Sequence, residues 1–308
     1  MSLPVRPAEI VGAVNILEGP RTDGIETKVA MKTSTDNRKG KSQNLEDILL
    51  DMESVLIAFS GGVDSTLLLR VAKDVLGNKV LAVTASSTVY PSEEIEQAKA
   101  LAHNLKARHE IIETRELTNP KFVSNPKDRC YWCKKELFAE LTSIAKENNL
   151  KYVVDGSNFD DLDDFRPGME AARELGVRSP LQEAMLTKPD IRSMSKRMGL
   201  PTWSKPSFAC LASRLPYGTR ITRENLITID KAERFLKDLG FTHVRVRHHD
   251  TIARIEVPKK DIPRLLSDKP SSKIVSYFKT LGYSYVTVDL EGYRTGSMNE
   301  VLTENGKG

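Results

Sequence analysis

The chain has 308 residues, of which 39% are hydrophobic, and is therefore long enough for two ordinary domains with separate cores. Its 46 basic and 42 acidic residues are mixed along the chain and give a formal charge of +4, without the continuous basic face of a nucleic-acid-binding protein. The N-terminus has no basic start followed by an apolar core, and nowhere do about 18 apolar residues run together. We therefore expect a cytoplasmic protein without a membrane span.

Residues 1–44 mix Pro, Gly, Thr, Lys and Asp without periodicity, which predicts a flexible extension that carries no chemistry. The pattern becomes regular from Leu45 onwards and predicts an alternation of strands and helices. Such alternation favours a parallel sheet with helices on both faces. The predicted strands are 55–59, 80–85, 109–113 and 152–155, and the predicted helices are 65–76, 92–105 and 133–147, with Ser92 as the N-cap of the second helix.

The order of predicted helices and strands changes after Pro206. A helix is expected over 224–239, followed by two alternating strands, "HVRVR" and "IARIEV", with His248 and His249 in the turn between them. More helix and a last strand near 285–290 complete a smaller α+β domain. The predicted domains are therefore the extension 1–44, an α/β domain 45–205 and an α+β domain 206–308.

The motif "SGGVDS" lies between the first strand and the first helix. Glycines at this point let the backbone turn tightly and direct several N–H groups to one spot beside the helix N-terminus, which makes an anion cradle. The aspartate approaches phosphate only through a cation such as Mg²⁺, so a metal–polyphosphate ligand is expected. The residues of this cradle are Ser60, Gly61, Gly62, Val63, Asp64 and Ser65.

This loop matches the SGGxDS motif of the PP-loop ATP pyrophosphatase superfamily. The resemblance implies cleavage of ATP between the α and β phosphates and transfer of AMP to a substrate oxygen. It also places the adenine near the end of the second strand, at Thr84 to Ser86. AMP turns a carboxylate or amide oxygen into a good leaving group, so the rest of the chain has to supply a nucleophile.

Three cysteines are an odd number and few for this length, which favours reduced thiols over a disulfide framework. Cys130 and Cys133 form a CxxC motif at a helix start, where the helix dipole and the neighbouring lysines are expected to lower thiol pKa values. Together with Cys210 they suit three corners of a 4Fe-4S cluster with one iron open for sulfide. A structural zinc site that lacks its fourth ligand and three unconnected buried thiols are the alternatives.

At this point the chain resembles the LarE family of ATP-dependent sulfur transferases, which help to build the nickel-pincer nucleotide cofactor. The matching stretches are "SGGVDS", "DGSNFDDLDDFRPG", "ACLASRLPYG", "HVRVRHHDTIARIEV" and "GYRTGSMNE", which together span about residues 45–301. The resemblance implies adenylylation of a carboxylate of pyridinium-3,5-biscarboxylic acid mononucleotide and its conversion to a thiocarboxylate. In one branch of the family the cysteine that corresponds to Cys210 gives up its own sulfur. In another branch three cysteines hold a 4Fe-4S cluster, and the CxxC motif favours that branch here.

A substrate with two carboxylates and a phosphate needs concentrated positive charge. Arg245 and Arg247 alternate with valines and so point to one face of a strand, either as a phosphate clamp or as a solvated strand face. Ser213 and Arg214 follow Cys210 closely and are expected at the same substrate. The remaining candidates are Gly156, Ser157 and Asn158 at the nucleotide and Glu233, Glu256 and Asp261 as metal ligands.

The expected cofactors are ATP, Mg²⁺ and a 4Fe-4S cluster, and the expected partners are a small nucleotide substrate, a sulfide or other sulfur donor and further copies of the chain in a homo-oligomer. No stable nucleic-acid partner is expected. A PP-loop tRNA thiolase is the nearest rival function, although net charge and an aromatic content of 6% give little sign of RNA binding. A glutamine-dependent amidotransferase is disfavoured, because residue 2 is Ser and no glutaminase module precedes the loop. A protein that binds ATP without turnover is the non-enzymatic alternative.

Overall fold

The computed structural model describes residues 40–163, 166–206, 209–294 and 297–299. Most of the predicted extension, residues 1–39, lies outside this part. Residues 41–52 are helical, and they bury Leu45, Leu49 and Met52 in the core that follows. From Lys41 onwards the chain forms one compact unit.

A four-stranded parallel sheet with the order β3-β2-β1-β4 forms the first part of this unit. Each strand is short and β1 and β2 are apolar on both sides, as expected for a sheet covered on two faces. The register places Val55 of β1 opposite Val80 of β2 and Tyr152 of β4. The strands are β1 (Val55–Ala58), β2 (Val80–Ser86), β3 (Arg108–Glu113) and β4 (Tyr152–Val154).

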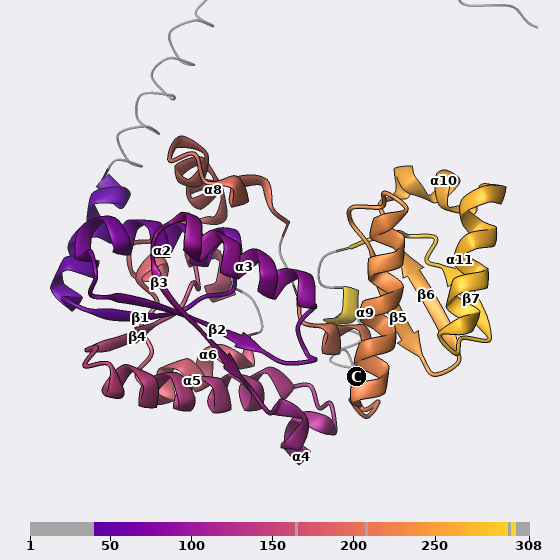
Figure 1. The fold of residues 1–308 in the computed structure, drawn as a ribbon, viewed down its shortest axis with the longest axis horizontal. Helices are drawn as coiled ribbons and strands as arrows, with labels where there is room; N and C mark the ends of the chain where they lie inside the picture. Colours follow the sequence, from indigo (N-terminus) through magenta and orange to yellow (C-terminus); the bar gives the residue numbers. More distant parts are fainter. Residues whose placement is uncertain (1–39, 164–165, 207–208, 295–296, 300–308) are drawn as a thin grey trace, which may run out of the picture. The chain divides into compact units, whose positions relative to one another are not determined.

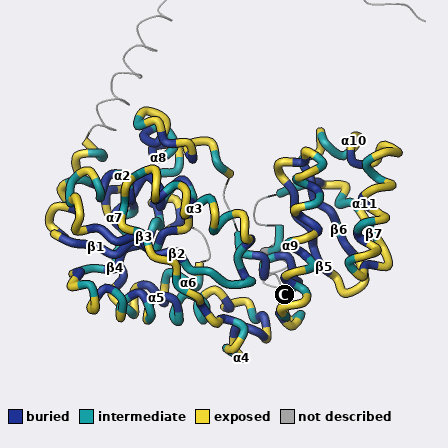
Figure 2. The backbone as a smooth tube through the Cα atoms, viewed as in Figure 1, coloured by how far each residue is buried: buried dark blue, intermediate teal, exposed yellow. Residues whose placement is uncertain are grey.

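Helices cover both faces of this sheet, which confirms the predicted fold class (Figure 1). On one face lie α2 (Val63–Leu76), α3 (Ser92–Asn104) and α8 (Lys188–Arg197), and on the other α5 (Arg129–Glu147) and α6 (Pro167–Glu174). Two hydrophobic cores result, one on each side of the strands. Figure 2 shows the strands buried between the two helical layers, whose outer sides are exposed. The short helices α4 (Pro120–Val123) and α7 (Pro180–Glu183) complete this part.

The second part contains a three-stranded sheet in the order β5-β6-β7, in which β5 and β6 are antiparallel and β6 and β7 are parallel. Helices α9 and α11 pack on it around a separate core that includes Leu236, Val246 and Phe278. This is the predicted α+β arrangement. Its elements are α9 (Arg223–Asp238), β5 (Arg245–His249), β6 (Ile252–Glu256), α10 (Ile262–Leu266), α11 (Asp268–Thr280) and β7 (Tyr285–Val288).

Several local predictions were wrong at the ends of elements. His248 and His249 belong to strand β5, and the turn lies at Asp250 and Thr251, because His248 is buried against Tyr283. Pro91 occupies the N-cap position of α3, and Ser92 is the first helical residue. Helix α5 begins at Arg129, four residues before the predicted start, so that both cysteines of the CxxC motif are helical. None of the described helices is long and apolar enough to cross a membrane.

Candidate functional site: the PP-loop and its surroundings

The loop between β1 and α2 is held by its own serines. Ser60 Oγ lies 3.1 Å from Ser65 Oγ and accepts a hydrogen bond from the Gly62 N–H at 3.3 Å. Gly61 has a φ of +66°, and a Cβ there would lie 3.0 Å from Ala98 of α3, so no other residue fits without strain. Gly62 then provides the N-cap of α2, followed by Val63. The motif therefore has the tight turn and helix N-terminus predicted for an anion cradle.

Asp64 lies in the first turn of α2, and its carboxylate is occupied by a cation from another element. Lys188 Nζ, at the start of α8, lies 2.5 Å from Asp64 Oδ2. Asn158 Nδ2 donates to the other carboxylate oxygen at 3.4 Å. Sequence reasoning missed Lys188, because a lysine at the start of a helix carries no signal of its own. The structure thus gathers Asp64 and Asn158, which were predicted, around a lysine that was not.

The segment after β4 lies directly against this loop. A Cβ on Gly156 would lie 3.1 Å from the Ser65 N–H, so the glycine permits the close approach. The Asp155 carboxylate accepts hydrogen bonds from the Ser157 N–H and Oγ and from Ser179 Oγ at 2.7–3.1 Å. This fixes the predicted residues Gly156, Ser157 and Asn158 beside the cradle.

Thr84 is buried within the sheet rather than open at its edge. Its hydroxyl donates to the Phe59 carbonyl at 2.8 Å and lies 2.8 Å from His109 Nε2. Burial and the charge of Lys99 lower the pKa of His109, which favours the neutral imidazole. Thr84 therefore supports the carbonyl that precedes the loop and does not offer its hydroxyl to solvent.

Candidate functional site: cysteines, arginines and relatives

Cys133 and Cys210 pack against the same apolar cluster, and Cys130 lies three residues before Cys133 in α5. Burial, Glu116 and Cys210 raise the pKa of Cys133 to about 12, and desolvation together with Cys210 raises that of Cys130. The predicted lowering of these pKa values was wrong. Burial outweighs the positive charge of Lys134, and Lys135 is paired with Glu174 at 2.9 Å.

The donor chemistry of three thiols suits a cluster. However, the described residues contain no group of three or more His, Cys, Asp or Glu side chains arranged to hold a metal ion. Tyr90 reaches this region as well, with its hydroxyl 3.9 Å from Cys133 Sγ. Asp261 lies half-buried at the end of a single 3-10 turn, apart from the two buried glutamates predicted with it, both of which face arginines.

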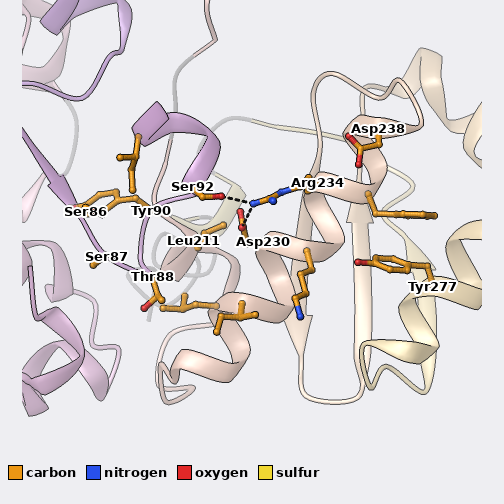
Figure 3. Close-up of a pocket in the computed structure, with 15 residues that line it drawn as sticks. Ser86, Ser87, Thr88, Tyr90, Ser92, Leu211, Asp230, Arg234, Asp238 and Tyr277 are labelled. Carbon is orange, nitrogen blue, oxygen red and sulfur yellow. Dashed lines mark hydrogen bonds and ion pairs between the residues drawn. The ribbon is translucent and has the colours of Figure 1, made fainter. Parts of the chain in front are cut away.

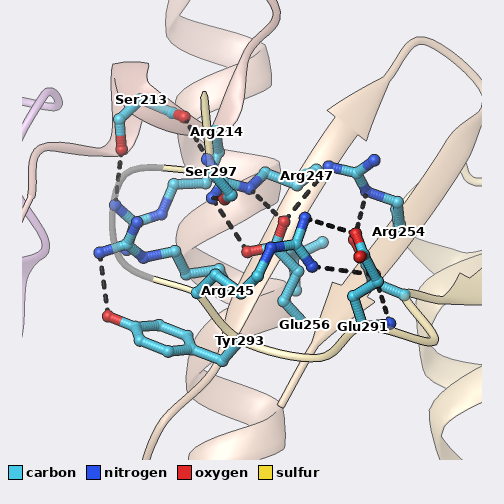
Figure 4. Close-up of polar contacts among 12 residues, drawn as sticks. Ser213, Arg214, Arg245, Arg247, Arg254, Glu256, Glu291, Tyr293 and Ser297 are labelled. Carbon is cyan, nitrogen blue, oxygen red and sulfur yellow. Dashed lines mark hydrogen bonds and ion pairs between the residues drawn. The ribbon is translucent and has the colours of Figure 1, made fainter. Parts of the chain in front are cut away.

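Buried arginines gather where β5 meets the turn that follows Cys210 (Figure 4). Arg214 donates from Nε and Nη2 to the two carboxylate oxygens of Glu233 at 2.8 and 3.0 Å. Arg247 does the same with Glu256 at 2.8 and 2.9 Å. These are two bidentate ion pairs in the interior.

Arg245 differs from these two arginines. Its Nη2 donates to Tyr293 Oη at 3.0 Å and its guanidinium stacks on the same ring, but among the described residues it has no carboxylate partner. Burial and the neighbouring charge of Arg214 lower its pKa. Ser213 is close by, since its carbonyl accepts from Arg247 at 2.7 Å and its hydroxyl from Arg214 at 2.9 Å. The predicted anion-binding residues are therefore assembled, with Arg245 carrying the uncompensated charge.

Two cavities lie in this part of the molecule, and the first of them contains the arginines. One of about 660 Å³ is lined by Arg214, Arg245 and Tyr293 and by Lys205, whose Nζ also lies 3.2 Å from the Gly61 carbonyl oxygen of the loop. The other, of about 470 Å³, lies between the end of β2 and α9, where Arg234 contacts Ser92 and Asp230 (Figure 3). The larger cavity therefore lies at the arginines and beside α3, and Lys205 on its wall contacts the loop; its volume is typical of small-molecule sites.

Comparison with known proteins agrees with this arrangement. The family model for NAD synthase matches residues 43–137, which include the loop and the CxxC motif. An uncharacterized protein of Synechocystis is 45% identical over 266 residues, which cover 86% of this chain and 99% of that protein. The pyridinium-3,5-bisthiocarboxylic acid mononucleotide synthase of Lactiplantibacillus plantarum is 40% identical over 265 residues, or 86% of this chain and 95% of that protein. This chain therefore belongs to the LarE family of pyridinium-3,5-bisthiocarboxylic acid mononucleotide synthases.

Proposed function

We propose that this protein is an ATP-dependent sulfur transferase that adenylylates a carboxylate of pyridinium-3,5-biscarboxylic acid mononucleotide and converts it into a thiocarboxylate. The observation that carries the proposal is Arg245, a buried guanidinium without a carboxylate partner among the described residues, on the wall of a cavity whose Lys205 contacts the loop. A buried charge of this kind costs several kcal/mol unless an anion neutralises it. The substrate phosphate supplies that anion, with Arg214 and Ser213 beside it.

In the first step a substrate carboxylate oxygen attacks the α-phosphorus of ATP, and the bond to the β-phosphate breaks to release pyrophosphate. The N–H group of Gly61 and the N-terminus of α2 hold the departing phosphates. Mg²⁺, when bound, screens the charge of pyrophosphate. Asp64 is the residue that would hold it, because its carboxylate already accommodates the cationic Lys188.

In the second step a sulfur nucleophile attacks the activated acyl carbon, and AMP leaves with the former carboxylate oxygen. Cys210 lies four residues before Arg214, whose Nη1 donates to the Cys210 carbonyl at 3.1 Å, and this contact supports a role for Cys210 at the same substrate. Cys130, Cys133 and Cys210 would hold a 4Fe-4S cluster that carries the sulfide. The alternative is that Cys210 gives up its own sulfur once per polypeptide.

The test uses anaerobically purified, cluster-reconstituted protein with Mg²⁺, ATP, sulfide and the pyridinium dicarboxylate mononucleotide. Pyrophosphate release that depends on this substrate, together with exchange of oxygen for sulfur by mass spectrometry, is the expected result. More than one sulfur per polypeptide supports the cluster, and unchanged transfer in a Cys130→Ser, Cys133→Ser variant supports sacrifice of Cys210. If both signals appear only with unmodified tRNA, the substrate assignment is wrong.

The phosphate role of Arg245 has its own control. Arg245→Gln is expected to raise the KM for the mononucleotide about 10- to 100-fold, because a charge-assisted contact is lost, and to change little for the nucleoside without phosphate. Arg264→Gln is the matched control, since Arg264 contacts the Gly240 carbonyl outside the site. If Arg245→Gln raises the KM equally for the mononucleotide and for the nucleoside, Arg245 does not bind the phosphate. Light scattering after size exclusion tests the further proposal of a homo-oligomer.

A further inference from the structure

Arg129, the first residue of α5, is as deeply buried as the two ion-paired arginines, with 4% of its surface exposed in each case. Among the described residues it has no carboxylate partner. Its neighbours are neutral: Nη1 donates to Asn125 Oδ1 at 2.9 Å, Nη2 to the Met298 sulfur at 3.4 Å, and the guanidinium lies 4.9 Å from the centre of the Tyr217 ring. A guanidinium buried among neutral groups needs an anion to offset its desolvation.

The orientation of this guanidinium is fixed by Asn125. The amide nitrogen of Asn125 donates to the carbonyls of Pro216 and Thr219 at 2.7 and 2.9 Å, so its oxygen has to accept from Arg129 Nη1. This leaves the opposite edge, formed by Nε and Nη2. Among the described residues Nε has no hydrogen-bond partner, Nη2 donates to a thioether, which is a weak acceptor, and the Tyr217 side chain also hydrogen-bonds with the guanidinium.

The geometry of the Nε and Nη2 donors determines which kind of anion they bind. In Arg214 and in Arg247, Nε and Nη2 are the two donors that grip a glutamate bidentately. A planar group with two oxygens matches this fork, whereas a single-atom anion satisfies only one donor. Among the described residues this edge binds a buried glutamate in Arg214 and in Arg247, and it binds the more exposed Glu183 in Arg178, whereas the equally buried edge of Arg129 has no carboxylate.

Arg129 also lies at the cysteines. It precedes Cys130, and burial together with the charges of Cys130 and Cys210 raises the pKa of Tyr217, against the opposing charge of Arg129. The 3-10 turn Ser297–Asn299 links it to the arginine group, because Ser297 Oγ accepts from Arg247 at 2.8 Å and Met298 contacts Arg129. This turn thus contacts Arg247 on one side and Arg129 on the other.

We propose that Arg129 binds a carboxylate of the substrate through Nε and Nη2, and that this carboxylate oxygen replaces the Met298 thioether at Nη2. The inference rests on the proposed function and adds a contact to it: Arg245 takes the phosphate, and Arg129 takes the ring carboxylate that is not reacting. The Met298 side chain is unbranched and flexible, so it leaves this position at little cost. Arg129 is therefore a determinant of specificity for the dicarboxylate.

The test compares binding of two ligands, the pyridinium dicarboxylate mononucleotide and the same molecule with one carboxylate replaced by a carboxamide. The wild-type protein is expected to bind the dicarboxylate about 10- to 100-fold more tightly, as for a lost charge-assisted hydrogen bond. Arg129→Gln should remove this preference while its affinity for the carboxamide stays within about two-fold, as for a site that no longer distinguishes the two groups. Arg129→Lys keeps the charge without the fork and should retain only part of the preference.

Met298→Leu is the control that removes the thioether but leaves both donors, and it should keep the preference. ATP binding by each variant shows whether the SGGVDS loop and the sheet around it are folded. If Arg129→Gln does not fold, the preference of Arg129→Lys for the dicarboxylate is the result that tests the inference. The inference is wrong if Arg129→Gln still prefers the dicarboxylate over the carboxamide, or if it binds both ligands more weakly by the same factor. Either result leaves the proposed sulfur transfer by the wild type unaffected.

The outcome in which the proposed function itself fails is separate. If the wild type does not convert the dicarboxylate, pyridine-3,5-dicarboxylate becomes the calorimetric probe. Binding that weakens at least about 10-fold in Arg129→Gln then supports a carboxylate site at this arginine. Absent binding, equal binding by both proteins, or equally tight binding of chloride overturns it.

Discussion

Substitution of Glu256 by glutamine tests whether this residue is a structural partner of arginine. Glu256 is fully buried and accepts from Arg247 at 2.8 and 2.9 Å and from Arg254 at 3.2 Å. Glutamine keeps the shape but removes the charge and turns one acceptor into a donor that faces Nη2 of Arg247. Breaking a buried pair in this way costs about 3–5 kcal/mol, because the arginine stays buried without its anion.

That free energy corresponds to a fall in the melting temperature on the order of 10 °C for a protein of this size. The assay is thermal unfolding followed by circular dichroism, with urea unfolding as a second probe. Glu291→Gln is the matched control, because Glu291 pairs with Arg294 at 2.9 Å on the surface and its side chain is 70% exposed. Exposed pairs of this kind contribute little, so the control should melt close to the wild type.

If Glu256→Gln melts at the same temperature as Glu291→Gln, the buried pair of Glu256 and Arg247 does not stabilise the fold. A metal-ligand role for Glu256 makes a different prediction, since a chelator would then lower the melting temperature of the wild type about as much as the substitution does. An unchanged wild type in the presence of chelator together with a destabilised variant leaves the ion pair as the explanation. The two roles predicted for this region are thereby separated by one experiment.

Three further predictions concern the loop, the cysteines and the second domain. Gly61→Ala is expected to weaken ATP binding by about 1–2 kcal/mol or more, because its φ is +66° and the new Cβ would lie 3.0 Å from Ala98; normal affinity for a fluorescent ATP analogue would contradict this. With a pKa of about 12, the Cys133 thiol in cluster-free wild-type protein should react with iodoacetamide at pH 8 about a thousand times more slowly than a free thiol, as tandem mass spectrometry of the peptide that contains Cys133 can measure. Burial lowers the pKa of His248 below its ordinary 6.5, so the unfolded chain binds more protons and stability is lost as the pH falls below about 6.5. His248→Asn should therefore show a shallower loss of unfolding free energy between pH 7.5 and 5.5, whereas a variant at the exposed His103 should not.

The sequence predicts the fold best where one periodicity dominates a long segment. The apolar strand Val55–Ala58 and the amphipathic helix Val63–Leu76 are recognisable because burial on two faces and on one face leave different patterns. It fails at the ends of elements, where the outcome depends on contacts made later in the chain. His248 reads as a turn residue, but Tyr283 of the following helix–strand connection holds it in the strand.

The candidate site divides in the same way. The loop residues Ser60 to Ser65, the CxxC motif and the alternation of Arg245 and Arg247 are visible in the sequence, because the spacing of residue types along one element specifies them. No spacing relates Lys188 to Asp64 across 124 residues, or Met298 to Arg129 across 169. Tertiary packing likewise decides which arginines pair with a glutamate and which of the described arginines have no carboxylate partner.

The sequence by itself determined the parallel sheet, the anion cradle and the three thiols, since local geometry and residue chemistry suffice for these. The tertiary structure decided how the charges are paired. It gave Arg214 and Arg247 their glutamates, and burial raised the pKa of the thiols that the helix dipole alone would lower. It also left Arg129 and Arg245 buried without a carboxylate partner among the described residues, because the pairing of a buried charge depends on every element packed around it.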